Sequence, residues 1–149
     1  MAARTFFIIG ILCTIVVFAA GLAHALSLPH KIGLSAEDYL RAQQLYAGWA
    51  FLGIASVGSL VLAIAFAVVF RGDATPFRAM IVASVAIALA LVVFFAFTFP
   101  ANRATQNWTM LPGGWEALRA RWEYSHLAGA MLNGIAVVAE LVAALRWRG

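Results

Sequence analysis

Four long apolar stretches, separated by polar segments, dominate the chain. They run over residues 5–28, 45–70, 79–99 and 127–145. Each is close to the roughly 17–25 residues that a helix needs to cross a membrane. Only Glu140 carries a formal charge inside them. The pattern predicts an all-α integral membrane protein, a single domain over residues 1–149 that forms an antiparallel four-helix bundle.

The polar connections between these stretches differ in length. Residues 71–78 are expected to form a short turn, whereas the connections 26–44 and 100–126 are long and rich in aromatic and polar side chains. Long connections often carry functional residues, because they lie at the surface and their side chains are not fixed by core packing. We therefore expect two long structured loops on the side of the bundle opposite the termini.

Two of the helices are expected to extend beyond the membrane. Pro29 and Gly33 indicate irregular chain, after which Ser35 is placed to cap a helix that nothing but glycine interrupts before Phe70. Residues 115–147 can form a second helix of about 33 residues, near 50 Å at 1.5 Å per residue. That length exceeds the roughly 30 Å of the hydrocarbon layer, so both helices could wall a vestibule.

Composition and charge agree with a membrane protein. An apolar content of 64% and a mean hydropathy of +0.94 exclude a soluble domain and a disordered chain. The 18 apolar residues from Phe6 to Ala23 exceed the usual signal-peptide core, which favours a retained first helix. The net charge of +4 is dispersed around the ends of the spans, so it does not indicate nucleic-acid binding.

The same charges bear on topology. Five lysines and arginines fall on each side of the predicted bundle, but the short loop and the two termini lie closest to the membrane. We therefore expect a bacterial inner-membrane protein with both termini in the cytoplasm.

A stripe of polar residues runs along the last apolar stretch, with a spacing of seven. It consists of Arg119, His126, Asn133 and Glu140. Seven residues are nearly two helical turns, so these side chains share one face. An ionisable group in hydrocarbon costs roughly 2.5–3.5 kcal/mol on insertion scales and usually faces a bundle interior. The stripe predicts a polar site in the bundle, with His126 and Asn133 as its catalytic candidates.

Two histidines are expected at similar depth in the membrane. His126 begins the fourth stretch and His24 ends the first one on the same side. Imidazole can act as an acid or base near neutral pH or ligate haem iron. The alternative is an interfacial histidine that bonds to water or to a loop carbonyl. A metal site would depend on tertiary proximity of the two histidines, while Glu123 is spaced to face His126 on the helix.

Glu140 lies near the other end of the same helix. It is within reach of Arg78 or Arg146, so a structural pair with an arginine or an interhelical donor is favoured over a proton relay.

Aromatic and amide side chains cluster beside the predicted vestibule. We assign substrate contacts to Asn102, Asn107, Trp108, Trp122 and Tyr46. Trp108, Trp115 and Trp122 also recur every seven residues, which is typical of an aromatic belt at the headgroup level, and that structural role is the default interpretation.

Small residues recur every fourth position in the second stretch. They are Ala55, Ser59, Ala63 and Ala67. Such a stripe lets membrane helices approach closely, either inside the bundle, which is favoured, or across the seam of a homo-oligomer. The single Cys13 excludes an intrachain disulfide.

Several segments resemble a widespread family of small four-helix membrane proteins related to anthrone oxygenases. The resemblance is carried by Phe99-Pro-Ala-Asn102, Asn107-Trp-Thr, Trp115-Glu-x-Leu-Arg119, Arg121-Trp-Glu-x-x-His126, Ala23-His24-x-Leu-x-Leu-Pro29-x-Lys31 and Tyr39-Leu-x-x-Gln43-Gln44-x-Tyr46. It covers nearly the whole chain. It implies oxidation of a polycyclic aromatic without an obvious cofactor, although this chain has Tyr124-Ser125-His126 where that branch usually has Trp-Asn-His.

A shorter segment is similar to styrene oxide isomerase, another small four-helix membrane enzyme. Trp122-Glu-Tyr-Ser-His126 is followed by Leu132-Asn133-Gly134, one residue further along than in that enzyme. The resemblance implies a haem whose iron His126 ligates and a substrate contact from Asn133. His24, expected at similar depth in the membrane, is a second candidate ligand of haem iron.

Three functions are compatible with these patterns. The first is a membrane-embedded enzyme, oxygenase- or isomerase-like, that acts on a lipophilic small molecule from the bilayer, aromatic or not, with or without haem at His126. The second is a non-catalytic membrane subunit that binds a partner protein through its long loops. A transporter is the third and least favoured, because no discontinuous span is expected.

Overall fold

The computed structural model describes residues 2–147, and over this range it consists of helices and turns. The elements are α1 (Ala2–Lys31), α2 (Ala36–Gln44), the 3-10 turn η1 (Trp49–Phe51), α3 (Leu52–Val69), α4 (Ala74–Val93), the π-helical segment η2 (Phe94–Thr98), α5 (Phe99–Ala104) and α6 (Trp115–Arg146). The predicted all-α fold is confirmed.

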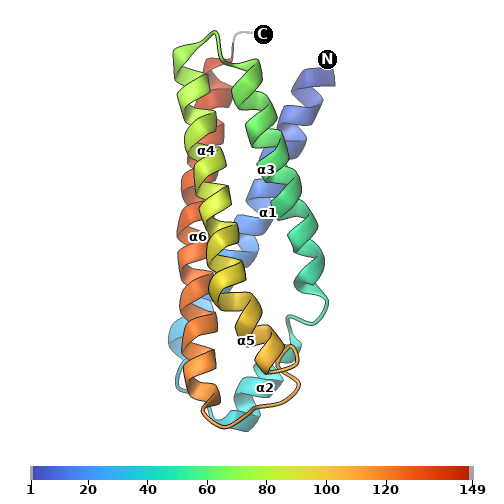
Figure 1. The fold of residues 1–149 in the computed structure, drawn as a ribbon, viewed down its shortest axis with the longest axis vertical. Helices are drawn as coiled ribbons and strands as arrows, with labels where there is room; N and C mark the ends of the chain where they lie inside the picture. The colour runs from blue at the N-terminus through green and yellow to red at the C-terminus, as the bar shows by residue number, and fades with distance from the viewer. Residues whose placement is uncertain (1, 148–149) are drawn as a thin grey trace.

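Four helices are long and apolar enough to cross a membrane. They are Ala2–Lys31, Trp49–Val69, Ala74–Ala104 and Trp115–Arg146. Along the circuit of the bundle, α1 packs on α3, α3 on α4, α4 on α6 and α6 back on α1. Both termini lie at one end, and α2 and the turn 105–114 lie at the other (Figure 1). We call residues 32–48 and 105–114 together the cap.

The outer surface of the bundle is apolar. Leu26, Ile54 and Leu145 are 70%, 79% and 85% exposed, and many other large apolar side chains on all four spans also face outward. In water such a surface would be unstable, whereas in hydrocarbon it is solvated. The chain is therefore built as an integral membrane protein.

The second span is shorter than predicted. The helix that Ser35 caps ends at Gln44, and the chain turns before the span begins at Trp49. Gly48 adopts φ = +85°, a left-handed conformation that glycine tolerates and a continuing helix does not. The expectation of one unbroken helix to Phe70 is thus wrong, because α2 ends at Gln44 and the left-handed Gly48 separates it from the span.

The first and third helices are longer than predicted. α1 runs through Pro29 to Lys31, where irregular chain was expected, and the buried Lys31 side chain holds this last turn against α6. The third helix begins at Ala74, because Asp73 accepts a hydrogen bond from the backbone N–H of Thr75 at 3.3 Å. The short turn is correspondingly tighter than residues 71–78. By contrast α6 matches the predicted long helix to within one residue.

The small-residue stripe packs inside the bundle. Ser59, Ala63 and Ala67 are buried, and Ala55 is half-buried. This outcome agrees with the favoured interpretation, and it leaves most of the stripe unavailable as a surface between copies of the chain.

Glu140 has an interhelical partner, and that partner is not an arginine. Thr14 on α1 donates a hydrogen bond to Glu140 Oε1 at 2.9 Å, while Oε2 has no hydrogen-bond partner within residues 2–147. Both residues are buried. The predicted interhelical donor is confirmed, and the specific pairing with Arg78 or Arg146 does not form. The residue lies outside the cavity described below, which favours its structural role.

Candidate functional site

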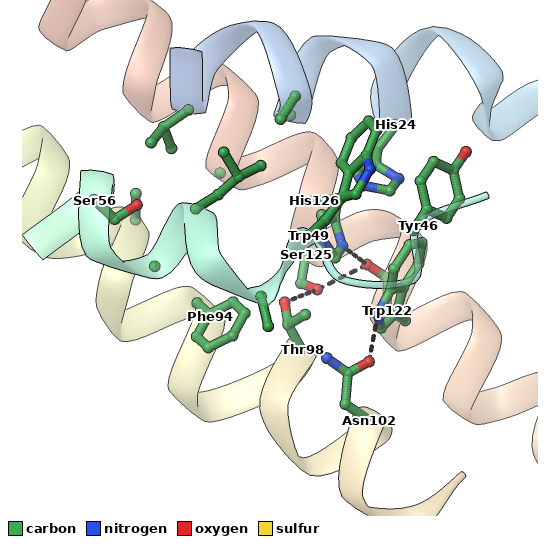
Figure 2. Close-up of a pocket in the computed structure, with 18 of the residues that line it drawn as sticks. His24, Tyr46, Trp49, Ser56, Phe94, Thr98, Asn102, Trp122, Ser125 and His126 are labelled. Atoms are coloured by element: carbon green, nitrogen blue, oxygen red, sulfur yellow. Dashed lines mark hydrogen bonds between the residues drawn. The ribbon is translucent and has the colours of Figure 1, made fainter. Parts of the chain in front are cut away.

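A cavity of about 590 Å³ lies between the spans and the cap (Figure 2). Its walls come from α1, α3, α4, η2 and α6, and the cap covers one end. All eight residues that the sequence singled out for catalysis, metal binding or substrate contact line it. They are His24, Tyr46, Asn102, Asn107, Trp108, Trp122, His126 and Asn133.

The polar stripe is divided among three places. His126 and Asn133 line the cavity, and Asn133 Nδ2 donates to the carbonyl oxygen of Gly129 at 2.9 Å. Arg119 instead braces the cap, because its Nη1 donates to the carbonyl oxygen of Leu34 at 2.8 Å. Glu140 pairs with Thr14 below the cavity. The shared face therefore contributes two of its four residues to the site.

The two histidines are in direct contact. The ring centroids of His24 and His126 are 4.3 Å apart, and the Trp122 ring lies 4.8 Å from the first and 4.0 Å from the second. The prediction that His24 and His126 lie at similar depth along the bundle is confirmed. The histidines meet because α1 and α6 approach each other closely at Gly21. A Cβ added to Gly21 would lie only 3.3 Å from the Ala130 backbone. One helical turn from this crossing, in the direction of the cap, each helix carries its histidine.

Tyr46 and Trp49 complete an aromatic wall around this pair. The ring of Tyr46 lies 4.2 Å from that of His24, and the ring of Trp49 lies 5.7 Å from it. We call His24, Tyr46, Trp49, Trp122 and His126 the ring cluster. It closes the cap end of the cavity.

A backbone carbonyl fixes the proton position on His126. Nδ1 of His126 lies 2.9 Å from the carbonyl oxygen of Trp122, and because a carbonyl can only accept, Nδ1 must carry the proton. Nε2 then has a lone pair in the neutral ring, and the only side-chain hydrogen bond of His126 within the described residues is the one made by Nδ1. Such a bond orients a histidine and raises its basicity, as in many metal and acid–base sites. The neighbouring His24 has a buried Nδ1 without a hydrogen-bond partner in residues 2–147.

The same carbonyl oxygen accepts a second hydrogen bond from Ser125 on α6, and the Ser125 hydroxyl in turn connects α6 to η2. Ser125 Oγ donates to Trp122 O at 2.8 Å, so the 2.7 Å contact between Thr98 and Ser125 uses the Thr98 proton. Thr98 belongs to the π-helical segment, which precedes Pro100. A proline lacks the N–H that an α-helix needs and its ring crowds the preceding turn, which explains the wider turn. Neither Thr98 nor Ser125 was predicted from the sequence as a residue of the site. The sequence signal that could have indicated the wider turn at Thr98 is Pro100.

Asn102 ties two tryptophans together. Its Oδ1 accepts from Trp108 Nε1 at 3.1 Å and from Trp122 Nε1 at 2.8 Å. Because two indole N–H groups require an oxygen there, the amide orientation is determined, and the side-chain hydrogen bonds of Asn102 to residues 2–147 use Oδ1 and leave Nδ2 free. Trp108 and Trp122 are 3% and 4% exposed. The aromatic-belt interpretation is therefore wrong for these two, because their indoles pack inside the protein.

The turn beside Asn102 contains backbone strain. Gln106, Asn107 and Trp108 all have positive φ, between 50° and 61°. Three consecutive non-glycine residues in this region are unusual, because each costs of order 1–3 kcal/mol and persists only where surrounding contacts impose it. Here the Asn107 N–H donates to Asn102 O at 2.7 Å, and the Trp108 N–H donates to Thr105 Oγ1 at 3.1 Å. These bonds hold Trp108 against the cavity wall.

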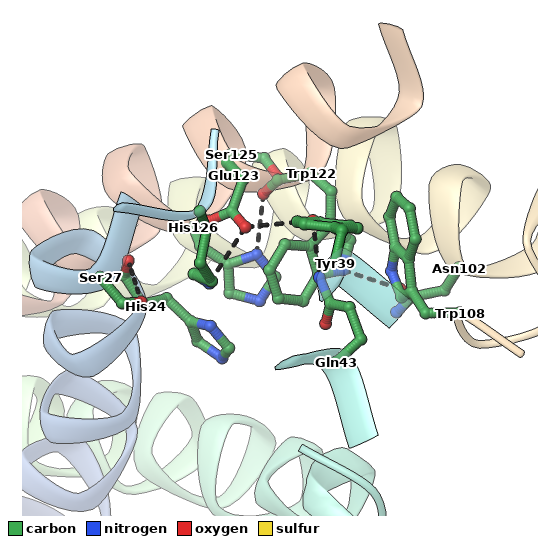
Figure 3. A network of polar contacts seen from close by, with 11 residues as sticks. His24, Ser27, Tyr39, Gln43, Asn102, Trp108, Trp122, Glu123, Ser125 and His126 are labelled. Atoms are coloured by element: carbon green, nitrogen blue, oxygen red, sulfur yellow. Dashed lines mark hydrogen bonds and ion pairs between the residues drawn. The ribbon is translucent and has the colours of Figure 1, made fainter. Parts of the chain in front are cut away.

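Behind the ring cluster lies a buried charge network (Figure 3). Lys31 Nζ lies 3.0 Å from Glu123 Oε1, close enough for an ion pair although its angles are not those of a hydrogen bond. Tyr39 donates to the same oxygen at 3.0 Å and accepts from Gln43 Nε2 at 2.6 Å. Burial raises the pKa of the Tyr39 phenol above its usual range, and the Glu123 carboxylate raises it further, so Tyr39 stays protonated.

This network shows a different partner for Glu123 from the one expected, and it places a cation against two rings of the ring cluster. Glu123 bonds to Lys31 and Tyr39 and does not pair with His126. Lys31 Nζ also lies 4.9 Å from the centroid of Tyr46 and 5.1 Å from that of Trp122, within the range of cation–π attraction. The cation thereby holds two rings of the ring cluster in place from outside the cavity.

The donor set matches haem only in part. His126 Nε2 could serve as an axial ligand. The His24 and His126 rings touch, however, so they cannot bind iron from opposite faces of a porphyrin. Within the described residues, no lysine or arginine lines the cavity to pair with haem carboxylates, and no group of three or more metal-binding side chains gathers. The residues therefore do not fit a haem held by both histidines.

Comparisons with protein-family models, with curated proteins and with solved structures find no match to this chain. The geometry of the site is therefore the basis on which a function is proposed for this chain.

Proposed function

We propose that the chain is a membrane-embedded enzyme that acts on a small lipophilic molecule in the cavity, with His126 as its general base. The observation that carries this proposal is the proton position on His126. Its Nδ1–H is committed to the Trp122 carbonyl, and its Nε2 lone pair is free at the wall of a cavity of about 590 Å³. A neutral imidazole whose orientation is fixed by a backbone carbonyl is placed to accept a proton from a bound molecule.

In the proposed mechanism the apolar walls hold the body of the substrate and His126 Nε2 takes a proton from it. The resulting imidazolium keeps its Nδ1–H on the Trp122 carbonyl, which stabilises the new charge. Returning the same proton to another substrate atom completes an isomerisation, and no co-reactant is needed. An oxygenation can begin with the same proton transfer, and then requires molecular oxygen. Asn133 lines the cavity and is the proposed second contact to the substrate.

The sequence resemblances support both reaction classes without separating them. The resemblance to anthrone-oxygenase relatives favours oxidation, and the similarity to styrene oxide isomerase favours isomerisation. Both families would use a lipophilic substrate in a four-helix membrane protein, in agreement with the apolar exterior and the internal cavity of this chain. A bacterial inner-membrane location with cytoplasmic termini is proposed on the charge pattern alone.

A conversion assay tests the proposal. Purified protein in lipid nanodiscs is incubated with a panel of lipophilic alcohols, phenols, ketones and epoxides, and loss of each compound is followed by mass spectrometry against empty nanodiscs. We expect at least one compound to be converted with multiple turnovers. If no compound is consumed and the protein co-purifies stably with another membrane protein, the non-catalytic subunit is the better explanation. An absorption spectrum of the oxidised and reduced protein, with or without a Soret band, decides whether haem takes part.

A further inference from the structure

The cavity has two ends of different polarity. The ring cluster and Asn102 form the cap end, and Figure 2 shows them together on one side, away from Phe94 and Ser56. The other end lies between the spans and is formed mostly by apolar side chains, among them Val17, Ile87 and Leu91. A molecule that fills this cavity therefore has an apolar body and one polar head.

The walls of the cavity carry no formal charge. Over residues 2–147, none of the lining residues is a lysine, arginine, aspartate or glutamate. The nearest buried charges, Lys31 and Glu123, are paired with each other behind the Tyr46 and Trp122 rings. A carboxylate or phosphate head would be desolvated here without a counter-charge, which is costly. The head must be uncharged.

The polar atoms of the wall that lack a protein partner indicate which hydrogen bonds the head of the ligand must make. Within residues 2–147, His126 Nε2 is an acceptor without a partner, Asn102 Nδ2 is a donor without one, and the buried Nδ1 of His24 is unpaired beside them. A hydroxyl can donate to the first and can also accept from the second, whereas an ether or epoxide oxygen can only accept. With an accept-only head, Nε2 would stay unpaired, and sites built around a hydrogen bond discriminate against analogues that leave it unmade.

The apolar body reaches the cavity from the bilayer. Val57 on α3 and Phe95 on η2 both line the cavity, yet they are 52% and 60% exposed on spans that face lipid. The wall between α3 and η2 is therefore accessible from the hydrocarbon layer. Molecules that partition into lipid are the ones that can reach it.

From these observations we infer that the ligand of this cavity is an uncharged lipophile whose head carries a hydroxyl, an alcohol or a phenol, that donates to His126 Nε2. This inference deepens the proposed function and rests on it for the role of the cavity. It concerns recognition, however, and can be tested by binding alone.

Three probes that share one ring system separate the alternatives. 2-Naphthol presents a neutral hydroxyl at pH 7, 2-methoxynaphthalene presents an accept-only oxygen, and 2-naphthoate presents a charge. Equilibrium dialysis against protein in nanodiscs, with empty nanodiscs subtracted, gives the binding that belongs to the protein. We expect 2-naphthol to bind about three- to tenfold more tightly than 2-methoxynaphthalene, the gain of one neutral hydrogen bond. The charged probe should bind more weakly than 2-naphthol.

Two phenylalanine variants provide the control. His126→Phe keeps a ring and removes the lone pair, so the ratio of the two affinities should fall to about one. His30→Phe changes an exposed histidine on the end of α1 and should leave the ratio unchanged. Circular dichroism and size-exclusion chromatography establish that both variants fold.

Each contrary result has a definite meaning. Tighter binding of 2-naphthoate, equal binding of the two neutral probes, no binding above empty nanodiscs, or a hydroxyl preference that persists in His126→Phe would each overturn the inference. His126-dependent turnover of a substrate without a hydroxyl would overturn it and leave the proposed function standing. Conversely, a clear hydroxyl preference in a protein that converts nothing would support this inference and contradict the proposed function.

Discussion

Replacing His126 with alanine should lower the rate of substrate conversion by about 10²–10⁴-fold, the usual contribution of a positioned general base. His126 lines the cavity, and a backbone carbonyl orients its ring so that the acceptor nitrogen, Nε2, makes no hydrogen bond to residues 2–147. The change removes a ring that is only partly buried, so the four spans should still form. Initial rates in nanodiscs, with thermal unfolding measured in parallel, check this prediction.

The matched control is His30→Ala. His30 lies on the same side of the bundle as His24, but it is exposed and does not line the cavity. It should retain full activity. If His126→Ala also retains full activity, both enzymatic interpretations fail, and the cavity residues become structural parts of a non-catalytic membrane subunit.

Replacing Glu123 with alanine should lower the free energy of unfolding by about 3–5 kcal/mol, the typical cost of leaving one member of a buried ion pair alone. The Glu123 side chain is 0% exposed, and it accepts contacts from both Lys31 and Tyr39. Its loss strands the ammonium group beneath the Tyr46 and Trp122 rings. Denaturant or thermal unfolding in detergent measures the loss.

The double variant Lys31→Met with Glu123→Leu separates a stranded charge from lost packing. Two apolar side chains of similar volume leave no unpaired charge, and such replacements are often nearly neutral. We expect the double variant to be more stable than Glu123→Ala. A loss below about 1 kcal/mol in Glu123→Ala would contradict the view that this pair is sealed from water, because exposed ion pairs contribute only that much.

The fold could be predicted because membrane spans are defined by length and apolarity. All four apolar stretches correspond to spans, and the long helix that starts at Trp115 was identified with its start. The errors lie where one residue decides the backbone path. Gly48 prevents the chain between α2 and the second span from continuing as one helix, and Pro29 is tolerated in α1 because the turn after it is held by Lys31. Tertiary contacts of that kind are not visible in local sequence.

The main residues of the candidate site could be predicted from their seven-residue spacing on one helix and from their position along the spans. The seven-residue spacing identified His126 and Asn133. His24 was identified because it lies at the same end of the bundle as His126, on an antiparallel span. The supporting contacts could not be predicted in the same way. The pairing of Lys31 with Glu123 joins two helices at the cap, and the bond from Thr98 to Ser125 depends on a π-helical turn. Both depend on the angles at which helices meet, which hydrophobic periodicity does not determine.

The most direct test is the position of the proton on His126. The chain has three histidines, so ¹⁵N-histidine labelling of the protein in bilayers gives a spectrum that His30→Ala and His126→Ala variants can assign. The structure predicts a neutral His126 ring with a protonated Nδ1, held by the Trp122 carbonyl, and an unprotonated Nε2. Addition of 2-naphthol should shift the Nε2 resonance. A ring that is protonated on Nε2, or on both nitrogens, at neutral pH would contradict the role of His126 as the acceptor in this cavity.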